Sequence, residues 1–380
     1  MININDPKDC CGCTACASIC THDAITMIPD ILGFLYPKIN LSKCVDCGLC
    51  DKVCTFNNDY DCSLNLPHPE AYGARHKNMR EVETSRSGAA FIAISDQILI
   101  QGGVVYGAGY TDHFRVVHKR ATNIKERDEF KGSKYVQSDL MGVFRQIKRD
   151  LKDGIKVLFT GTPCQTAGLR SYINKNLHEN LYLVDIICHG VPSPYIWRDY
   201  LSYLEKKNGS PIIQVNFRDK QHYGWRNHHE TFIFERDGKK WDNKEMWYTK
   251  IFYQNLIFRH SCSNCHFCNT KRPSDLTLAD FWGWEKTNPE INKDDKGISL
   301  ILLNTAKGRK LWKSAQKDLF FFPAKLEDCI QTRMQFATPQ HKKRNKFEQD
   351  YLNKGFEYIY KKDYNQLNIF SRIFNKIKKH

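Results

Sequence analysis

Short apolar runs in the middle of the chain predict buried strands. Residues 156–160 (KVLFT) and 181–188 (LYLVDIIC) are nearly continuous hydrophobic runs, as in strands covered on both faces. Residues 165–173 (QTAGLRSYI), which lie between them, have the spacing of a helix. The segment from Lys156 to Cys188 therefore predicts a β-α-β unit, whose strands are parallel because a helix connects them.

Alternating strand and helix patterns continue on both sides of this unit. Further strands are predicted at 71–76, 103–110, 115–120 and 298–304, and a small antiparallel element with a turn at Asp237–Gly238 is predicted over 228–242. Helices are predicted over 87–100, after the cap Asn123, from the cap Asp139 to the stop at Gly154, from Thr305, and as a basic amphipathic helix over 370–380.

These patterns divide the chain into four parts. Residues 1–62 form a cysteine-rich module, a polar linker follows near Asp59–Pro69, and residues 70–150 and 151–325 form an α/β region. Residues 326–380 form a helical basic tail. The predicted fold class is α+β, with a small N-terminal module, an α/β domain with a mixed, partly parallel sheet, and a helical C-terminal tail.

Eight cysteines in the first 54 residues repeat one spacing. The run C-x2-C-x2-C-x3-C occurs twice at an offset of 34 residues, which matches the pattern of a bacterial ferredoxin with two [4Fe-4S] clusters. The fourth cysteine of each run ligates the other cluster in that pattern. One cluster is therefore expected at Cys10, Cys13, Cys16 and Cys54, and the other at Cys44, Cys47, Cys50 and Cys20. Cys11 lies outside the pattern and is interpreted as a spare thiol.

A second set of cysteines predicts a third metal site. Cys262, Cys265 and Cys268 follow one another at three-residue intervals, whereas a cubane needs four protein ligands. Cys164 and Cys188 follow the two strands of the β-α-β unit, and the carboxyl ends of parallel strands meet at one sheet edge. Five thiols are therefore candidates for four positions.

Composition narrows the class of protein. The segment 1–10 has no apolar signal sequence, and no run is long and clean enough to span a bilayer, so we expect a cytoplasmic protein whose thiols serve metals. The formal net charge is +15. Each cubane with four thiolates carries about −2, so three clusters would lower the net charge to about +9. No nucleic-acid motif is present, and the residual positive charge suits an acidic electron carrier or an anionic cofactor.

Three segments carry a resemblance to a known family. Residues 161–169 (GTPCQTAGL), 188–194 (CHGVPSP) and 261–283 (SCSNCHFCNTKRPSDLTLADFWG) resemble the coenzyme F420 hydrogenase/dehydrogenase beta-subunit family, and the likeness runs from about Ala71 to Trp284. The resemblance implies an iron–sulfur flavoprotein oxidoreductase that binds FAD and a cubane cluster. Many bacterial members occur with polysaccharide-synthesis genes, which suggests such a pathway as the context.

The resemblance also implies roles for particular residues. The third cluster is expected at Cys164, Cys188, Cys262 and Cys265, because the family run usually has two cysteines and Cys268 is the extra one. FAD rather than NAD is expected, since the GxGxxG fingerprint is missing. The residues implied to contact the flavin are Ser87, Gly88, Lys134, Tyr135, Gln137, Ser138, Gly161, Thr162, Gln165, Asp280 and Trp282.

The expected function is electron transfer between [4Fe-4S] clusters and a two-electron acceptor through FAD. A redox partner protein, such as ferredoxin or another reductase subunit, and a small-molecule acceptor are the expected partners, and nucleic acid is not. Two alternatives stay open: a non-catalytic electron-transfer subunit of a hydrogenase- or dehydrogenase-like complex, and, from another class, a zinc-stabilised binding protein that uses the basic surface.

Overall fold

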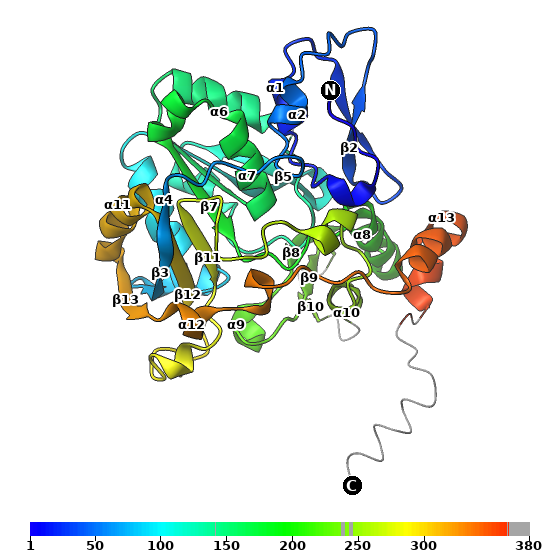
Figure 1. Cartoon of the computed structure of the whole chain (residues 1–380). Coiled ribbons are helices and arrows are strands. Elements are labelled where there is room, and N and C mark those ends of the chain that lie inside the picture. Colours follow the sequence, from blue (N-terminus) through cyan, green and yellow to red (C-terminus); the bar gives the residue numbers. More distant parts are fainter. Residues whose placement is uncertain (141, 237–239, 243–245, 363, 365–380) are drawn as a thin grey trace.

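A computed structural model describes residues 1–140, 142–236, 240–242, 246–362 and 364 (Figure 1). The strands are β1 Ile25–Pro29, β2 Leu35–Ile39, β3 Asn65–His76, β4 Val104–Thr111, β5 Arg115–Ala121, β6 Val157–Gly161, β7 Leu181–Ile186, β8 Ile212–Asn216, β9 Thr231–Phe234, β10 Lys240–Asp242, β11 Leu276–Asp280, β12 Ser299–Thr305 and β13 Leu319–Ala324. The α-helices are α1 Ala15–Ile19, α2 Leu49–Lys52, α3 Met79–Thr84, α4 Ala90–Leu99, α5 Ile124–Asp128, α6 Val143–Lys152, α7 Pro163–Tyr172, α8 Pro194–Asn208, α9 Lys220–Tyr223, α10 Trp247–Tyr253, α11 Ala306–Ala315, α12 Leu326–Cys329 and α13 Arg344–Lys361. None of the helices in these ranges combines the length and apolar character needed to cross a bilayer.

The main sheet is mixed, as predicted. In the described residues its eight strands follow the order β13-β3-β12-β11-β7-β6-β4-β5. The central strands β4, β6, β7 and β11 are parallel, and the outer pairs are antiparallel. The predicted β-α-β unit is confirmed, because β6 pairs in parallel with β7 and α7 connects them. The parallel strands therefore end at one edge, which is where ligands bind in open α/β sheets.

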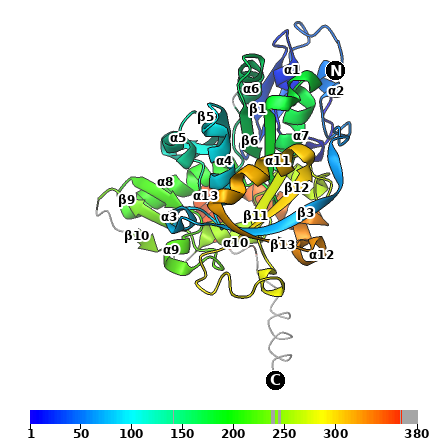
Figure 2. The same ribbon diagram turned by 90° about the vertical axis from the view of Figure 1, so that its left-hand side faces the viewer.

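Helices cover both faces of this sheet. On one face, α6 and α7 pack Phe144, Ile147 and Leu169 against the sheet, in a cluster that also takes in apolar residues of the N-terminal module. On the other face, α4 and α11 supply residues such as Ile94 and Trp312. Figure 2 shows the module beside α6 and α7, so its cysteines lie near the helix that begins at the strand end.

The N-terminal region is ferredoxin-like and small. An antiparallel hairpin of β1 and β2 separates the two cysteine runs, and each run leads into a short helix, α1 or α2. Thr14 and Gly48, which immediately precede these helices, both take positive φ values, 65° and 72°. The two cysteine runs thus have matching backbone turns, as the sequence duplication predicts.

A second apolar layer covers the other end of the molecule. The three-stranded antiparallel sheet β10-β9-β8 packs with α8, α10 and α13 around Trp197, Tyr200 and Tyr248. The antiparallel element predicted over 228–242 is confirmed by β9 and β10, although its turn at Asp237–Gly238 lies outside the described residues. The basic helix predicted over 370–380 also lies outside them.

Two local predictions are wrong. Asp139 does not cap the following helix: α6 begins at Val143 after Gly142, because the Asp139 backbone pairs with β5 and its carboxylate pairs with Arg115 at 2.6 Å. The predicted polar linker is partly strand, since β3 already begins at Asn65.

Candidate metal and flavin sites

Three cysteines of the first run and one cysteine of the second line a single cavity. Its walls include Cys10, Cys13, Cys16 and Cys54, the four predicted to share a cluster. Gly12, with a φ of +71°, makes the turn between the first two. A Cβ on Gly12 would lie 2.8 Å from a guanidinium nitrogen of Arg259, so glycine is also needed for a close approach to that side chain.

The other predicted ligand set lies toward the outside of the module. Cys20 and Cys50 share an apolar cluster with Ile2 and Ile25. The backbone N–H of Ala24 donates to the Cys20 sulfur at 3.4 Å, and that of Ile2 donates to the Cys50 sulfur at 3.2 Å. Hydrogen bonds to sulfur tune the potential of an iron–sulfur cluster. Cys44 is half-buried and Cys47 is exposed, so this set borders solvent.

A third group of thiols gathers at the end of the parallel strands. Cys164 lies in the first turn of α7, Cys188 follows β7, and the run 262–268 arrives from a separate segment. All five predicted cysteines line one cavity, and Cys11 of the N-terminal module is a sixth. Within the described ranges, no three His, Cys, Asp or Glu side chains converge as the ligands of a single metal ion would.

Neighbouring thiols shift one another's pKa values in opposite directions. The pKa of Cys11 is raised well above its ordinary value by hydrogen bonds to Cys13 and to Cys164. The hydrogen bond from Cys11 lowers the pKa of Cys164 to about 7. The hydrogen bond from Cys265 likewise lowers the pKa of Cys268 to about 7. Cys164 and Cys268 therefore become thiolates, the form that binds metal, more readily than an ordinary cysteine does.

Two buried arginines place positive charge beside the cysteine sites. Arg259 is 1% exposed and donates to the Cys10 carbonyl at 2.7 Å, to the Cys10 sulfur at 3.5 Å and to the Leu35 carbonyl at 2.9 Å. Arg272 lines the third cavity and pairs with the fully buried Asp185 at 2.9 Å. Cations beside thiolates offset the negative charge of a cluster site.

Some predicted flavin residues surround a buried cluster of charged and aromatic side chains. Asp280 ends β11, accepts from Arg218 at 3.0 Å and from the Trp225 indole at 3.0 Å, and lies 3.6 Å from Arg86. The rings of Trp282 and Trp225 stack with their centroids 4.4 Å apart. The Tyr135 hydroxyl oxygen accepts a hydrogen bond from the Arg218 guanidinium at 3.4 Å. Ser87 and Gly88 follow Arg86 directly.

Lys134 lies in an adjoining polar cleft. This cleft has a volume of about 650 Å³ and is also lined by Arg80, Lys131 and Phe217. The Phe217 ring packs against Tyr135, with centroids 5.6 Å apart, and so connects the cleft to the charged cluster. The Lys134 ammonium donates to the carbonyls of Glu129 and Lys131 at 2.7 and 2.9 Å, and burial lowers its pKa to about 7.

The remaining predicted flavin residues form a separate group nearer the cysteines. Gln137 donates to the Cys11 carbonyl at 2.9 Å and accepts from Arg259 at 3.1 Å. Gln165 donates to Ser138 at 3.1 Å and accepts from the backbone of Thr162 at 3.0 Å, while Gly161 ends β6 just before Thr162. The structure thus divides the predicted flavin contacts into two groups, and their role in binding FAD stays a prediction.

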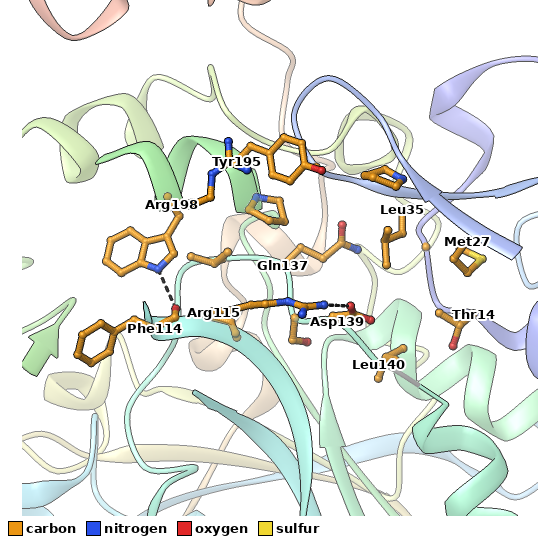
Figure 3. Close-up of a pocket in the computed structure, with 18 of the residues that line it drawn as sticks. Thr14, Met27, Leu35, Phe114, Arg115, Gln137, Asp139, Leu140, Tyr195 and Arg198 are labelled. Carbon is orange, nitrogen blue, oxygen red and sulfur yellow. Dashed lines mark hydrogen bonds and ion pairs between the residues drawn. The ribbon is translucent and has the colours of Figure 1, made fainter. Parts of the chain in front are cut away.

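A larger cavity lies between the module and the rest of the chain. It has a volume of about 1050 Å³, and Figure 3 shows Thr14, Met27 and Leu35 of the module opposite Tyr195 and Arg198 of α8. Gln137 and Ser138 also line it, so the second group of predicted flavin residues borders this cavity. Its size lies at the upper end of the usual range of ligand pockets, about 300–1,000 Å³.

Sequence reasoning misses three residues that organise these sites. Cys11 is interpreted from the sequence as a spare thiol, yet it lines both cysteine cavities. Arg259 carries no signal beyond its place three residues before Cys262. Gly168 lies against the module, since a Cβ there would be 2.7 Å from the Cys13 sulfur. The adjacent pair Cys10–Cys11 is the one feature of the sequence that could have drawn attention to Cys11.

Comparison with known proteins identifies the two parts of the chain. Residues 154–326 match the family model for the C terminus of the coenzyme F420 hydrogenase/dehydrogenase beta subunit, and residues 9–58 match the model for a 4Fe-4S dicluster domain. The chain therefore carries a domain of the coenzyme F420 hydrogenase/dehydrogenase beta-subunit family, matched over less than half of its length, and a 4Fe-4S dicluster domain. It is therefore an iron–sulfur electron-transfer protein of a hydrogenase/dehydrogenase-like family, with a ferredoxin-like region at residues 9–58.

One solved structure that is similar to this chain comes from a hydrogenase complex. The chain is similar to a chain in the xenon-derivatised F420-reducing [NiFe] hydrogenase complex from Methanosarcina barkeri, with 17% sequence identity and a TM-score of 0.47. The similarity covers 67% of this chain and 82% of that chain. No curated protein matches the sequence.

Proposed function

We propose that the chain is an iron–sulfur flavoprotein oxidoreductase that passes electrons between three cubane clusters and a two-electron acceptor through FAD. The observation that carries this proposal is the third cavity, where cysteines from three distant segments lie together beside the cysteine cavity of the ferredoxin-like region. A clustering of partly buried thiols at the carboxyl edge of a parallel sheet is typical of a metal site rather than of core packing.

The proposed ligands follow from the cavities and the spacing. The first cluster takes Cys10, Cys13, Cys16 and Cys54, and the second takes Cys44, Cys47, Cys50 and Cys20. The third takes Cys164, Cys188, Cys262 and Cys265, the four of its five cavity thiols that the family resemblance implies. Cys268 competes for the third site, because it lines the same cavity. Clusters carry one electron at a time and a flavin carries one or two, which is the chemistry that the bound groups would supply.

We place FAD in the cleft at Lys134 and the adjoining charged cluster. Arg80, Lys131 and Lys134 are the cations of this cleft that a pyrophosphate would meet, alongside the carboxylates of Glu81, Asp128 and Glu129. Buried nitrogen atoms of Arg86 and Arg218 have no hydrogen-bond partner in the described residues, so a bound group with acceptor atoms would satisfy them. Asp280 and Trp282 would then border the ring system, as expected from the resemblance.

The second set of cysteines reaches the surface at Cys47, which favours electron exchange with a partner protein. Cys47 is exposed and Cys44 half-buried, so a cluster there would lie near the surface, while the third cavity is enclosed by the module and the sheet edge. The partner is a ferredoxin or another reductase subunit, and the final acceptor is a small molecule, with polysaccharide synthesis as the proposed context. A non-catalytic electron-transfer subunit remains the alternative if no small molecule accepts electrons from reduced flavin.

The test is anaerobic purification of the full chain, followed by iron, sulfide and flavin analysis. We expect about 12 iron atoms per chain, four for each of three cubanes, together with releasable FAD. Cys188→Ser should lower the iron content by one cluster, whereas Cys268→Ser should leave it unchanged. Iron for two clusters only would refute the third site, and zinc without iron would refute the proposal as a whole. Loss of a cluster in Cys268→Ser alone would move the fourth ligand to Cys268.

A further inference from the structure

The larger cavity between the N-terminal module and the rest of the chain shares a wall with the first cysteine cavity. Gly12, Thr14 and Met27 line both of them. The larger cavity has a volume of about 1050 Å³, and the first cysteine cavity is lined by the four predicted ligands of the first cluster. A molecule bound in the larger cavity would therefore be separated from that cluster site by this one wall.

The lining of the larger cavity suits an uncharged and largely apolar molecule. The polar side chains of Gln137 and Ser138, which line it, are already hydrogen-bonded within the protein. Apolar side chains from the module, from β5, from the segment before α6 and from α8 make up much of the rest, among them Ile25, Leu35, Val116, Val136, Leu140 and Trp197. An apolar molecule that enters the cavity would leave few polar groups without a partner.

The charges around this cavity are balanced. Each of its three arginines pairs with a carboxylate: Arg115 with Asp139 at 2.6 Å, Arg145 with Asp23 at 2.9 Å, and Arg198 with Asp199 at 2.8 Å. No lysine lines it in the part of the chain that the structure describes. A molecule with phosphate groups would therefore have to compete with these carboxylates, whereas a neutral molecule would not.

Backbone strain is concentrated around this cavity. Of the nine non-glycine residues with positive φ in the described ranges, four line it, namely Thr14, Asp23, His113 and Phe114. His113 and Phe114 are adjacent, with φ values of 52° and 54°, and the Trp197 indole N–H donates to the Phe114 carbonyl at 3.0 Å (Figure 3). Strained backbone of this kind clusters at ligand-binding sites, so it supports a bound molecule independently of the volume.

We propose that this cavity binds a neutral two-electron acceptor of the quinone class beside the first cluster site. A quinone is planar, uncharged and largely apolar, which matches the lining. It takes two electrons, one at a time, through the wall of Gly12, Thr14 and Met27, and two protons from solvent at the rim, where His113 is exposed. Its two carbonyl groups thereby become hydroxyl groups, and the reduced partner protein loses the two electrons by way of the second set of cysteines.

This exit for electrons goes beyond the proposed function, because it needs the first cluster but neither FAD nor the third cluster. The test therefore uses the full chain, purified anaerobically and depleted of flavin, with menadione as the neutral quinone and a naphthoquinone sulfonate as its anionic relative. Iron is counted first. Binding to the oxidised protein is then measured by calorimetry. Electron transfer is followed by the visible absorbance of dithionite-reduced protein after the dithionite has been removed.

Two variants fill the cavity from neighbouring strands. Met27→Trp does so from β1 and Leu35→Trp from β2, and Leu35 does not line the first cysteine cavity. Ile28→Trp is the matched control, because successive side chains of a strand point to opposite faces and Ile28 does not line the larger cavity. If Met27→Trp loses iron, Leu35→Trp decides the test.

We expect menadione to bind wild type and Ile28→Trp equally, more tightly than the sulfonate does, and to reoxidise the reduced protein without flavin. The filled variants should bind menadione about tenfold more weakly, because the added ring occupies its space, and should be reoxidised more slowly by a similar factor. Unchanged binding in the filled variants, tighter binding of the sulfonate, reoxidation that requires added FAD, or displacement of menadione by FAD would each overturn the inference. Iron for two clusters only would refute the third site of the proposed function and not this inference.

Discussion

At the scale of single residues, the thiols and the cations near them decide what the chain can bind. The predicted ligands are not distinguished by burial alone, since Cys329 is buried and Cys47 is exposed. What distinguishes them is their surroundings: Cys10 accepts from the buried Arg259, and the buried Arg272 lines the cavity of Cys164, Cys188, Cys262 and Cys265. A buried cation next to a thiolate favours the charged form, and therefore favours metal binding.

The pKa of Lys134 predicts how flavin binding depends on pH. Burial lowers this pKa to about 7, so free protein loses the ammonium proton as the pH rises above 7. A phosphate group favours the protonated form, so binding takes up a proton and weakens between about pH 7 and pH 9. Titration of FAD into flavin-depleted full-length protein should show this decline. Lys134→Met should bind FAD about tenfold more weakly, a loss of about 1.4 kcal/mol, with a flatter pH profile.

A substitution in the larger cavity serves as the control for that experiment. Tyr195 lines the cavity between module and body and lies outside the Lys134 cleft. Tyr195→Phe should therefore bind FAD like the wild-type protein. The opposite result, with FAD lost in Tyr195→Phe and retained in Lys134→Met, would place the flavin in the larger cavity beside Gln137 and Ser138.

At the scale of elements, α7 performs two tasks. Its first turn carries Cys164, and its middle contacts the N-terminal module through Gly168. The helix begins with a capping box, in which Thr162 and Gln165 fix the first turn and so fix the Cys164 thiol. The helix thus sets the position of the sheet-edge site relative to the module.

Gly168→Ala should weaken the docking of the module onto α7. Alanine favours a helix by about 1 kcal/mol over glycine, but the new methyl would lie 2.7 Å from the Cys13 sulfur and 2.8 Å from its Cβ. Overpacking of this kind costs about 1–3 kcal/mol, so we expect a net loss of stability. Hydrogen exchange should show faster exchange in residues 1–58, and Ser171→Ala on the same helix is the control. Unchanged exchange and iron content would show that the contact tolerates a methyl group.

Most helices and strands could be predicted from the sequence because the residue patterns that indicate them are local. The parallel pair β6 and β7 followed from two apolar runs and a helix between them, and the ends of those strands pointed to Cys164 and Cys188 as partners of the regularly spaced Cys262, Cys265 and Cys268. The start of α6 could not be predicted, because Asp139 is taken by Arg115 and β5, which lie more than twenty positions away. Cys11 and Arg259 were missed for the same reason: their partners are distant in sequence.

At the scale of the whole molecule, the ferredoxin-like region shares its core with the rest of the chain. Cys11, Cys13, Ala15 and Val53 belong to the same apolar cluster as Phe144 of α6 and its neighbours. Arg145 of α6 donates to the carbonyls of Ala17, Ser18 and Cys20 at 3.0, 3.0 and 2.8 Å, which satisfies the last turn of α1. Separating the two parts would expose apolar surface and break these bonds.

Because of this shared core, we expect the module and the sheet to unfold together. Anaerobic heating of the full chain, followed both by far-ultraviolet circular dichroism and by visible absorbance of the clusters, should give coincident transitions. Arg145→Ala should lower both midpoints equally, since losing its bonds to the α1 carbonyls costs about 1 kcal/mol or more. Lys148→Ala, on the same helix, controls for a lost surface charge. If cluster absorbance instead disappears at a lower temperature while the circular dichroism of the sheet persists, the module is an independent folding unit, and the apolar contacts of Cys13 and Val53 contribute little to its stability.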